Sequence, residues 1–279
     1  MGVRWPKKET AWIADRVLYV SIPFTWRLPI VKDHLKSKDL FWDEAVVGGP
    51  AVRLMPDYLA GMDGVKVDIG DNELAMSKVN ADACKTTVGC ARKCEFCAVP
   101  IMEPEFKKIF YVPRPIVCDN NILAMGKPYF RRVCRSLYNM PYVDFNQGLD
   151  CRLLDDEFAE MIAKLLPKKT ICRLALDHES ERDEWVSAFE SLRKYEIPKK
   201  LIRTYALIGF DASPPDDWKR CEFIEKYNHS SVLPMWYHSL NQLQPNIVTE
   251  DQKDLGWTDD MRKDIMGWYY QHRGEKYGG

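Results

Sequence analysis

The chain has 279 residues, a formal net charge of −1, 46% hydrophobic residues and 29% charged residues. This length is sufficient for one large domain, or for one domain with a smaller second one. The near-neutral charge excludes a global basic field that attracts nucleic acid, although a local patch can serve a neutral protein. No apolar stretch approaches the roughly 18–20 residues of a membrane helix, so we expect no membrane partner.

Nine cysteines, an odd number, occur in the chain, and its opening segment MGVRWPKKETAW has no apolar signal core. We therefore expect a cytoplasmic protein whose cysteines do not form disulfides. In such a protein, clustered thiols are interpreted as metal ligands.

The first part of the chain alternates short β-branched segments with helical ones. Strands are expected at residues 16–23, 43–50 and 64–71, each stopped by Pro or Gly, and helices at residues 28–37 and 53–61. Strands that alternate with helices pair in parallel. Residues 1–78 are therefore predicted to form a small α/β domain.

The same alternation resumes from residue 84 with longer helices. Strands are expected at residues 84–89, 114–122, 142–148, 170–177, 201–210 and 230–237. Between them, apolar residues recur at helical spacing, as in Phe158, Met161, Ile162 and Leu165. Six strand–helix units predict a parallel barrel, complete or partial, over residues 79–240, with its chemistry at the carboxyl ends of the strands. Residues 241–279 are predicted to form a C-terminal helical extension, with a helix at 257–273.

Three cysteines follow the first of these strands in the segment CARKCEFC, with the spacing C-x3-C-x2-C: Cys90, Cys94 and Cys97. Structural zinc requires four ligands, and the nearest further thiol, Cys84, is expected to point away along a strand. A [4Fe–4S] cluster bound by three thiolates keeps one iron open for another ligand. The spacing favours this cluster, with a zinc site or three unrelated buried thiols as the alternatives.

The segment CARKCEFC, with an aromatic residue before its last cysteine and a strand before its first, resembles the signature of the radical S-adenosylmethionine (radical SAM) superfamily. The resemblance implies a partial (β/α)6 barrel of TIM type. It also implies that S-adenosylmethionine binds the open iron and is cleaved to a 5′-deoxyadenosyl radical that abstracts hydrogen from a substrate. The electron would come from a donor of flavodoxin or ferredoxin type.

The same resemblance implies a set of residues that bind S-adenosylmethionine: Phe96, Asp119, Asn120, Asn121, Asp177, Ile208 and Gly209. Phe96 and the Ile208–Gly209 backbone would meet the adenine, and Asp177 the ribose. The CDNN segment stands where the family commonly has a GGE-type motif for the methionine amino group, and its oxygens are suitable acceptors for an ammonium. The alternatives are loop packing for Phe96, an Asn-rich turn for CDNN, a helix N-cap for Asp177 and a strand end for Gly209.

Further polar residues are candidates for the mouth or lumen of the barrel. Gln147, Asp150 and Arg152 follow the third strand of the barrel, Arg173 lies inside the fourth, and Tyr205 and Tyr237 lie on later ones. Because a buried arginine without a partner is costly, Arg173 should meet a carboxylate or an anionic ligand. The cysteines outside the loop are scattered singly and are interpreted as small apolar fillers.

The N-terminal segments VSIPFTW and AVVGGP are similar to the Rossmann-like domain that precedes the barrel in cobalamin-type radical SAM enzymes. None of the five histidines has an aspartate two positions earlier, so the cobalamin pattern D-x-H-x-x-G is missing and we predict a degenerate relative. The cysteine loop also resembles that of the tRNA methylthiotransferases. Methylthiolation is disfavoured because their second three-cysteine cluster is absent upstream of Cys90.

The substrate is the least specified part of the prediction. Small stand-alone proteins of this kind, common in bacteria and phages, resemble enzymes that tailor nucleobases. The favoured hypothesis is therefore a rearrangement or functionalisation, of isomerase or transferase type, of a modified nucleotide such as a thymidine adduct in phage DNA. The alternatives are modification of a peptide or small metabolite, a zinc-stabilised nucleic-acid-binding module, and an electron-transfer iron–sulfur protein. Paired basic residues such as Lys107–Lys108 and Arg131–Arg132 could meet phosphate.

Overall fold

The structure is a computed structural model that describes residues 5–37, 42–70, 73–165, 169–228 and 232–268. The chain divides into two compact units. Unit 1 comprises residues 1–83, 97–104 and 238–245, and unit 2 comprises residues 84–96, 105–237 and 246–279. The predicted boundary between residues 78 and 79 stays a prediction.

Unit 1 contains a four-stranded sheet in the order β1-β2-β3-β4. The strands are β1 (Thr10–Ala14), β2 (Val17–Ser21), β3 (Glu44–Gly48) and β4 (Val65–Val67). β2, β3 and β4 pair in parallel, as predicted, whereas β1 is an unpredicted antiparallel partner of β2. Asp15 and Arg16, with φ of 50° and 62°, make the two-residue hairpin turn, which requires positive φ at both positions.

The helices of unit 1 are α1 (Leu28–Lys36), α2 (Pro50–Leu54), α3 (Glu73–Val79) and α4 (Val99–Met102), with 3₁₀ turns η1 (Thr25–Arg27) and η2 (Pro56–Tyr58). In α1 the residues at helical spacing, Leu28, Val31 and Leu35, are buried, which confirms the helix expected at 28–37. The prediction of a helix at 53–61 is wrong. The helical conformation is interrupted at Met55 because Pro56 lacks a backbone donor and disfavours the helical conformation of the residue before it.

Unit 2 is built on a six-stranded sheet in the order β12-β11-β10-β9-β8-β5. The strands are β5 (Ala83–Cys84), β8 (Ile116–Val117), β9 (Val143–Phe145), β10 (Thr170–Ala175), β11 (Ile202–Ile208) and β12 (Val232–Trp236). Neighbours from β8 to β12 pair in parallel. The α/β class and the six-stranded parallel sheet are therefore confirmed, and spatial neighbours in the sheet are also successive in the chain.

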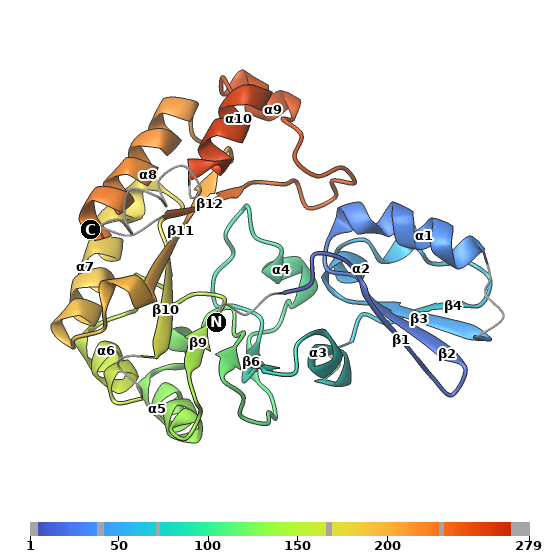
Figure 1. Ribbon diagram of the computed structural model, residues 1–279, viewed down its shortest axis with the longest axis horizontal. Coiled ribbons are helices and arrows are strands. Elements are labelled where there is room, and N and C mark those ends of the chain that lie inside the picture. The colour runs from blue at the N-terminus through green and yellow to red at the C-terminus, as the bar shows by residue number, and fades with distance from the viewer. Residues whose placement is uncertain (1–4, 38–41, 71–72, 166–168, 229–231, 269–279) are drawn as a thin grey trace. The chain divides into compact units, whose positions relative to one another are not determined.

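Helices connect these strands and lie along one side of the sheet (Figure 1). They are α5 (Lys127–Leu137), α6 (Asp156–Ala163), α7 (Arg182–Lys194) and α8 (Pro214–Asn228), with 3₁₀ turns η3 (Ile122–Met125), η4 (Glu179–Glu181) and η5 (Lys199–Leu201). Right-handed crossovers between successive neighbours place every helix on the same face. The predicted face of α6, with Phe158, Met161 and Ile162, is buried in the core of this unit.

The strand predicted over residues 84–89 is divided in two, which corrects the prediction. β5 ends at Cys84, and Thr87–Val88 (β6) instead pairs antiparallel with Lys107–Lys108 (β7). Asp119, which follows β8, accepts hydrogen bonds from Thr86 and Thr87. These hydrogen bonds fix the segment that follows β5 to the end of β8.

The C-terminal part of unit 2 contains α9 (Glu250–Asp254) and α10 (Asp259–Met266). The helix expected at 257–273 is confirmed over α10, and residues 269–273 lie outside the described part of the chain. Thr249 and Gln252 form a capping box at the start of α9. In the described ranges, no helix combines the length and apolar character needed to cross a membrane.

Candidate functional site

The cysteine loop follows β6 through Gly89, whose φ of 75° turns the chain. Cys90 and Cys94 belong to unit 2, whereas Cys97 opens the segment 97–104 of unit 1. All three cysteines are half-buried. The sulfur of Cys90 accepts the backbone N–H of Arg92 at 3.3 Å.

The environment of Cys94 combines burial with positive charge. Burial raises the pKa of the Cys94 thiol, and the guanidinium of Arg152 acts in the opposite direction, toward the thiolate. Cys90 contributes a smaller electrostatic effect on the same thiol. The loop therefore places a cation beside one of the predicted ligands, and thiolates are the forms that bind metal.

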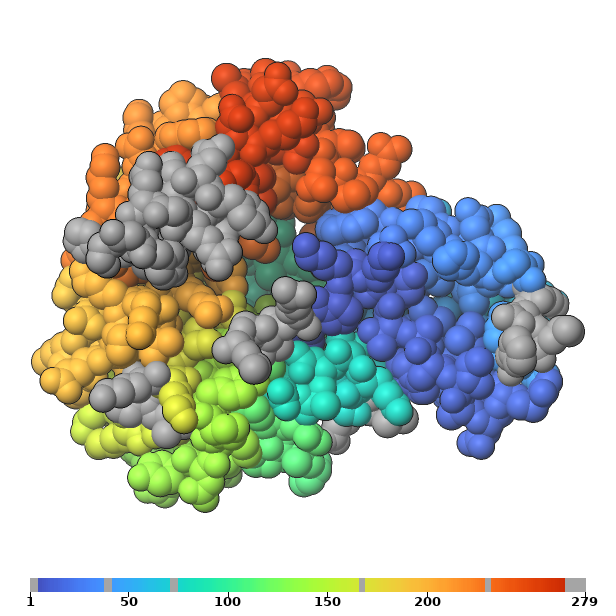
Figure 2. Space-filling view, in the orientation of Figure 1, coloured from blue at the N-terminus to red at the C-terminus, as the bar shows by residue number. Residues whose placement is uncertain are grey.

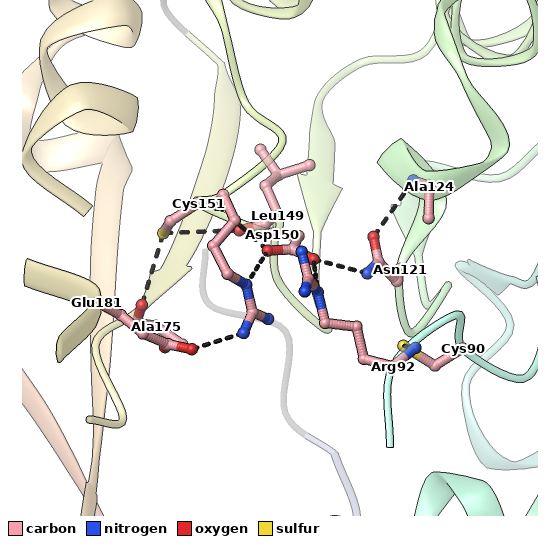
Figure 3. Close-up of polar contacts among 10 residues, drawn as sticks. Cys90, Arg92, Asn121, Ala124, Leu149, Asp150, Cys151, Ala175 and Glu181 are labelled. Carbon is pink, nitrogen blue, oxygen red and sulfur yellow. Dashed lines mark hydrogen bonds and ion pairs between the residues drawn. The ribbon is translucent and has the colours of Figure 1, made fainter. Parts of the chain in front are cut away.

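Asp150 connects this loop to the carboxyl ends of the strands (Figure 3). It follows β9, and its carboxylate accepts hydrogen bonds from Nε of Arg92, Nε of Arg152 and Nδ2 of Asn121, each at 2.8 Å. Burial alone would raise the pKa of Asp150, but the hydrogen bonds from Arg152, Arg92 and Asn121 hold it below its usual value. Asp150 is therefore an anion shared by two cations.

The two arginines differ in their second contacts. Arg152 also pairs with Glu181, at the end of η4, whereas the backbone N–H of Arg92 bonds to the sulfur of Cys90. The sequence analysis predicts Asp150 and Arg152 as candidates for the mouth of the barrel but does not single out Arg92. Its contact with Asp150 spans 58 residues of sequence, and no local pattern indicates it.

The CDNN segment lies between the cysteine loop and Asp150, but its side chains have internal partners. Asp119 is buried and accepts bonds from Thr86 and Thr87; burial raises its pKa, and these bonds act against the rise. Asn120 donates to the carbonyl of Gly89 at 3.3 Å. Asn121 caps η3 by accepting from Ala124 N and donates to Asp150. The predicted residues are thus near the loop, and binding of a methionine amino group stays a prediction.

At the ends of β10 and β11, Asp177 accepts the backbone N–H of Leu207 at 3.1 Å. Burial raises the pKa of Asp177 to about 6. Phe96, from the cysteine loop, packs edge-on against Phe210, with ring centroids 5.4 Å apart, and Phe210 packs in turn against Tyr237. Phe96 is therefore in contact with Phe210, the residue that directly follows Ile208–Gly209, and an adenine contact of these residues stays a prediction.

Gly209 is required at its position. Its φ is 73°, and an added Cβ would lie 2.7 and 2.8 Å from ring atoms of Trp236. Its N–H donates to Asp217 at 2.7 Å, and its carbonyl accepts from Gln252 at 2.8 Å. No sequence pattern indicates that the side chain of Gln252 reaches the end of β11.

The remaining candidates are divided between the interior and the surface. Arg173 binds Asp144 through two hydrogen bonds of 2.7 and 2.6 Å and also contacts the hydroxyl of Tyr205, which confirms that this buried arginine meets a carboxylate. Gln147 is exposed. The scattered cysteines are mostly buried, and burial raises the pKa of Cys118, Cys134, Cys151, Cys172 and Cys221.

The donor chemistry of the loop fits an iron–sulfur cluster, since three thiols lie within eight residues, with an N–H directed at one sulfur and a guanidinium beside another. Among the described residues, no group of three or more His, Cys, Asp or Glu side chains forms a site that could hold a metal ion. No protein-family model matches the chain, and no curated protein matches it either. The cluster and S-adenosylmethionine therefore stay predictions.

Proposed function

We propose that the protein is a radical SAM enzyme in which Cys90, Cys94 and Cys97 hold a [4Fe–4S] cluster. The observation that supports this most is the three-cysteine loop at the end of β6, which has Cys94 beside the Asp150-bound guanidinium of Arg152. When bound, the cluster supplies one electron for the cleavage of S-adenosylmethionine to methionine and a radical that abstracts hydrogen. A flavodoxin- or ferredoxin-type donor would supply that electron.

The fold supports the same proposal. A six-stranded sheet in chain order, with its helices on one side, is compatible with a partial (β/α)6 barrel. The parallel strands β2, β3 and β4 of unit 1 are compatible with a small Rossmann-like domain. Candidate side chains follow β8, β9, β10 and β11, at the edge where such folds keep their chemistry.

In this proposal the residues of the chain have distinct tasks. Asp150 holds the guanidinium groups of Arg92 and Arg152 near the loop, where two cations meet one buried anion. Their remaining N–H groups are available to a carboxylate or phosphate, which guanidinium binds well. Phe96 offers an apolar ring to the adenine, and Asp177 an acceptor to a ribose hydroxyl.

The proposed substrate is a modified nucleotide, and a cytoplasmic location remains part of the proposal. Two arginines that reach water suit the anionic charge of a nucleotide. If the substrate is instead a peptide or a small metabolite, the mass-spectrometric test described next would identify it.

The test begins with anaerobic reconstitution of the full chain with iron and sulfide. We expect about four irons per chain, as one cube needs, no stoichiometric zinc, and release of 5′-deoxyadenosine when dithionite and S-adenosylmethionine are added. Cys94→Ala should lose both the iron and the product. Substrate class is then read by mass spectrometry after incubation with modified DNA, free nucleosides and peptides.

Cys151→Ala is the matched control, because Cys151 is a half-buried thiol that follows Asp150 and is not a predicted ligand. It should keep the iron and the activity. A reconstituted wild-type protein that retains only zinc, or that holds the cluster yet makes no 5′-deoxyadenosine, would contradict the proposed function.

A further inference from the structure

The segment after β7 runs along one side of α5. Lys108 Nζ lies 4.9 Å from the ring centroid of Tyr129, and Tyr111 Oη lies 3.0 Å from Ser136 Oγ. Tyr129 and Ser136 are seven residues apart, which is two helical turns on the same side of α5. Phe110, between the two contacts, therefore lies alongside this helix. In Figures 1 and 2, α5 is green and belongs to the surface of its unit.

The side chain of Phe110 is 85% exposed, the largest exposed fraction among the large hydrophobic residues that the structure describes. Its neighbours Ile109 and Tyr111 are half-buried, and Ile109 N donates to the carbonyl of Thr86 at 3.0 Å. The backbone on either side of Phe110 is thus fixed while its ring faces water. Single exposed hydrophobic side chains are common on protein surfaces, so the charges near this ring decide whether it belongs to an interaction surface.

Two cations without acidic partners lie close to this segment. Lys108 and Arg132 are exposed, and neither forms an ion pair with a carboxylate in the described ranges. Both lie over the ring of Tyr129, Lys108 at 4.9 Å and Arg132 at 5.0 Å from its centroid. By contrast, Lys107 pairs with Glu105, and Arg131 pairs with Glu157. We name Lys108, Phe110 and Arg132 the Phe110 ridge.

We propose that the Phe110 ridge binds single-stranded nucleic acid. A base offers a flat face for Phe110, and phosphates complement the two cations that have no carboxylate partner, which is the combination that single-strand-binding surfaces use. A duplex covers its base faces by stacking, so it satisfies only the cations. A membrane surface would require more than one exposed ring to gain comparable apolar burial.

This surface lies within unit 2 and does not depend on the cysteine loop. If both proposals hold, the modified nucleotide is part of a polymer strand. The two can fail separately, because binding to the ridge is measured without iron, reductant or S-adenosylmethionine.

The test is fluorescence anisotropy of the full chain with labelled oligo(dT) and oligo(U) of about 15 nucleotides, a length within known single-strand site sizes. Salt is varied between about 50 and 200 mM, where phosphate contacts are lost most steeply. Phe110→Ala should raise the Kd about tenfold and leave the salt slope unchanged, because it removes a stacking partner and no charge. Arg132→Ala should reduce the slope by about 0.7, as expected for one phosphate contact on a single strand.

Arg131→Ala is the matched control, since it removes a cation from the same helix that is already paired with Glu157. It should leave both the Kd and the slope near those of the wild type, and far-UV circular dichroism checks that every variant is folded. Wild-type protein that binds neither oligonucleotide overturns the proposal. So does Phe110→Ala that binds like the wild type, a duplex that binds as tightly as the single strand, or binding to phosphatidylserine vesicles alone. Tighter binding of either DNA or RNA supports the proposal and identifies the strand.

Discussion

Two aspartates of unit 2, Asp144 and Asp150, bind guanidinium groups in different surroundings. In the sheet, Asp144 of β9 and Arg173 of β10 pair through two hydrogen bonds, with side chains 2% and 9% exposed. Beside the cysteine loop, Asp150 is also buried, at 4% exposed, but its partners Arg92 and Arg152 are 35% and 31% exposed. The Asp144–Arg173 pair is therefore shielded from water. In the group of Asp150, Arg92 and Arg152, the two arginines reach water.

The difference indicates what each arrangement can do. The fork of Arg173 is occupied by Asp144 and the Tyr205 hydroxyl, which suits a contact that joins two strands. Asp150 instead binds two half-exposed cations, of which Arg152 also pairs with Glu181, so guanidinium groups that reach water lie close to the cysteine loop. We infer that the buried pair stabilises the sheet, whereas the group around Asp150 is suited to an anionic ligand.

The largest expected loss of stability comes from breaking the buried Asp144–Arg173 pair. Asp144→Ala leaves the Arg173 guanidinium buried without its carboxylate, and such uncompensated charges cost about 3–5 kcal/mol. Urea unfolding monitored by circular dichroism measures the loss. The double variant Asp144→Leu, Arg173→Met removes both charges and should recover most of the stability. If Asp144→Ala costs no more than a typical exposed pair, the assignment of a structural role to this contact is wrong.

A third carboxylate extends the comparison because no guanidinium forms an ion pair with it among the described residues. Burial raises the pKa of Asp177 to about 6, so the folded state retains a proton that the unfolded state releases near its ordinary value. This contribution to stability is present at low pH and is lost as the pH rises from about 4 through 6, by up to about 3 kcal/mol. Unfolding free energies at several pH values measure it.

Asp177→Asn keeps an acceptor for the N–H of Leu207 but cannot ionise. Its stability relative to the wild type should therefore increase as the pH rises from 4 to 7. A difference between the two proteins that stays constant across this range would show that Asp177 has an ordinary pKa in the folded state.

The strands of unit 2 were predictable because each is a local apolar run bounded by polar or turn residues, as in β10 and β11. β1 was missed for physical reasons. It is an edge strand with mostly exposed or half-buried side chains, and the turn after it uses Asp15 and Arg16 at positive φ rather than the usual glycine. The division at 84–89 was missed because it depends on hydrogen bonds that Thr86 and Thr87 donate to Asp119, which is 33 residues away from Thr86.

The prediction of the candidate site from the sequence had the same limit. The three thiols are recognised from their spacing, and the polar residues after β8, β9 and β10 from their positions at strand ends. The pairing of Arg92 with Asp150 and the reach of Gln252 to Gly209 are tertiary contacts over 58 and 43 residues, so neither leaves a periodic or motif signal. Local patterns therefore predicted which residues are candidates but not how they neutralise one another.

The smallest expected change in stability is for the group of Asp150, Arg92 and Arg152. Asp150→Asn removes the shared negative charge, but Arg92 and Arg152 already reach water and can be hydrated there, so we expect a loss of about 1 kcal/mol or less in urea unfolding. The larger consequence should be electrostatic. Without the carboxylate, Arg92 loses its ion pair while Arg152 keeps Glu181, so the loop gains one positive charge and the reduction potential of a reconstituted cluster should rise.

A redox titration followed by electron paramagnetic resonance measures that shift, with Asp177→Asn as a variant that removes a carboxylate from a position without a guanidinium ion pair. A large loss of stability in Asp150→Asn with no change in potential would mean that Asp150, like Asp144, only holds the fold together. A rise in potential with stability nearly intact would separate the two aspartates by function, because it requires the charge of Asp150 to act on the cysteine loop rather than on the packing of the sheet.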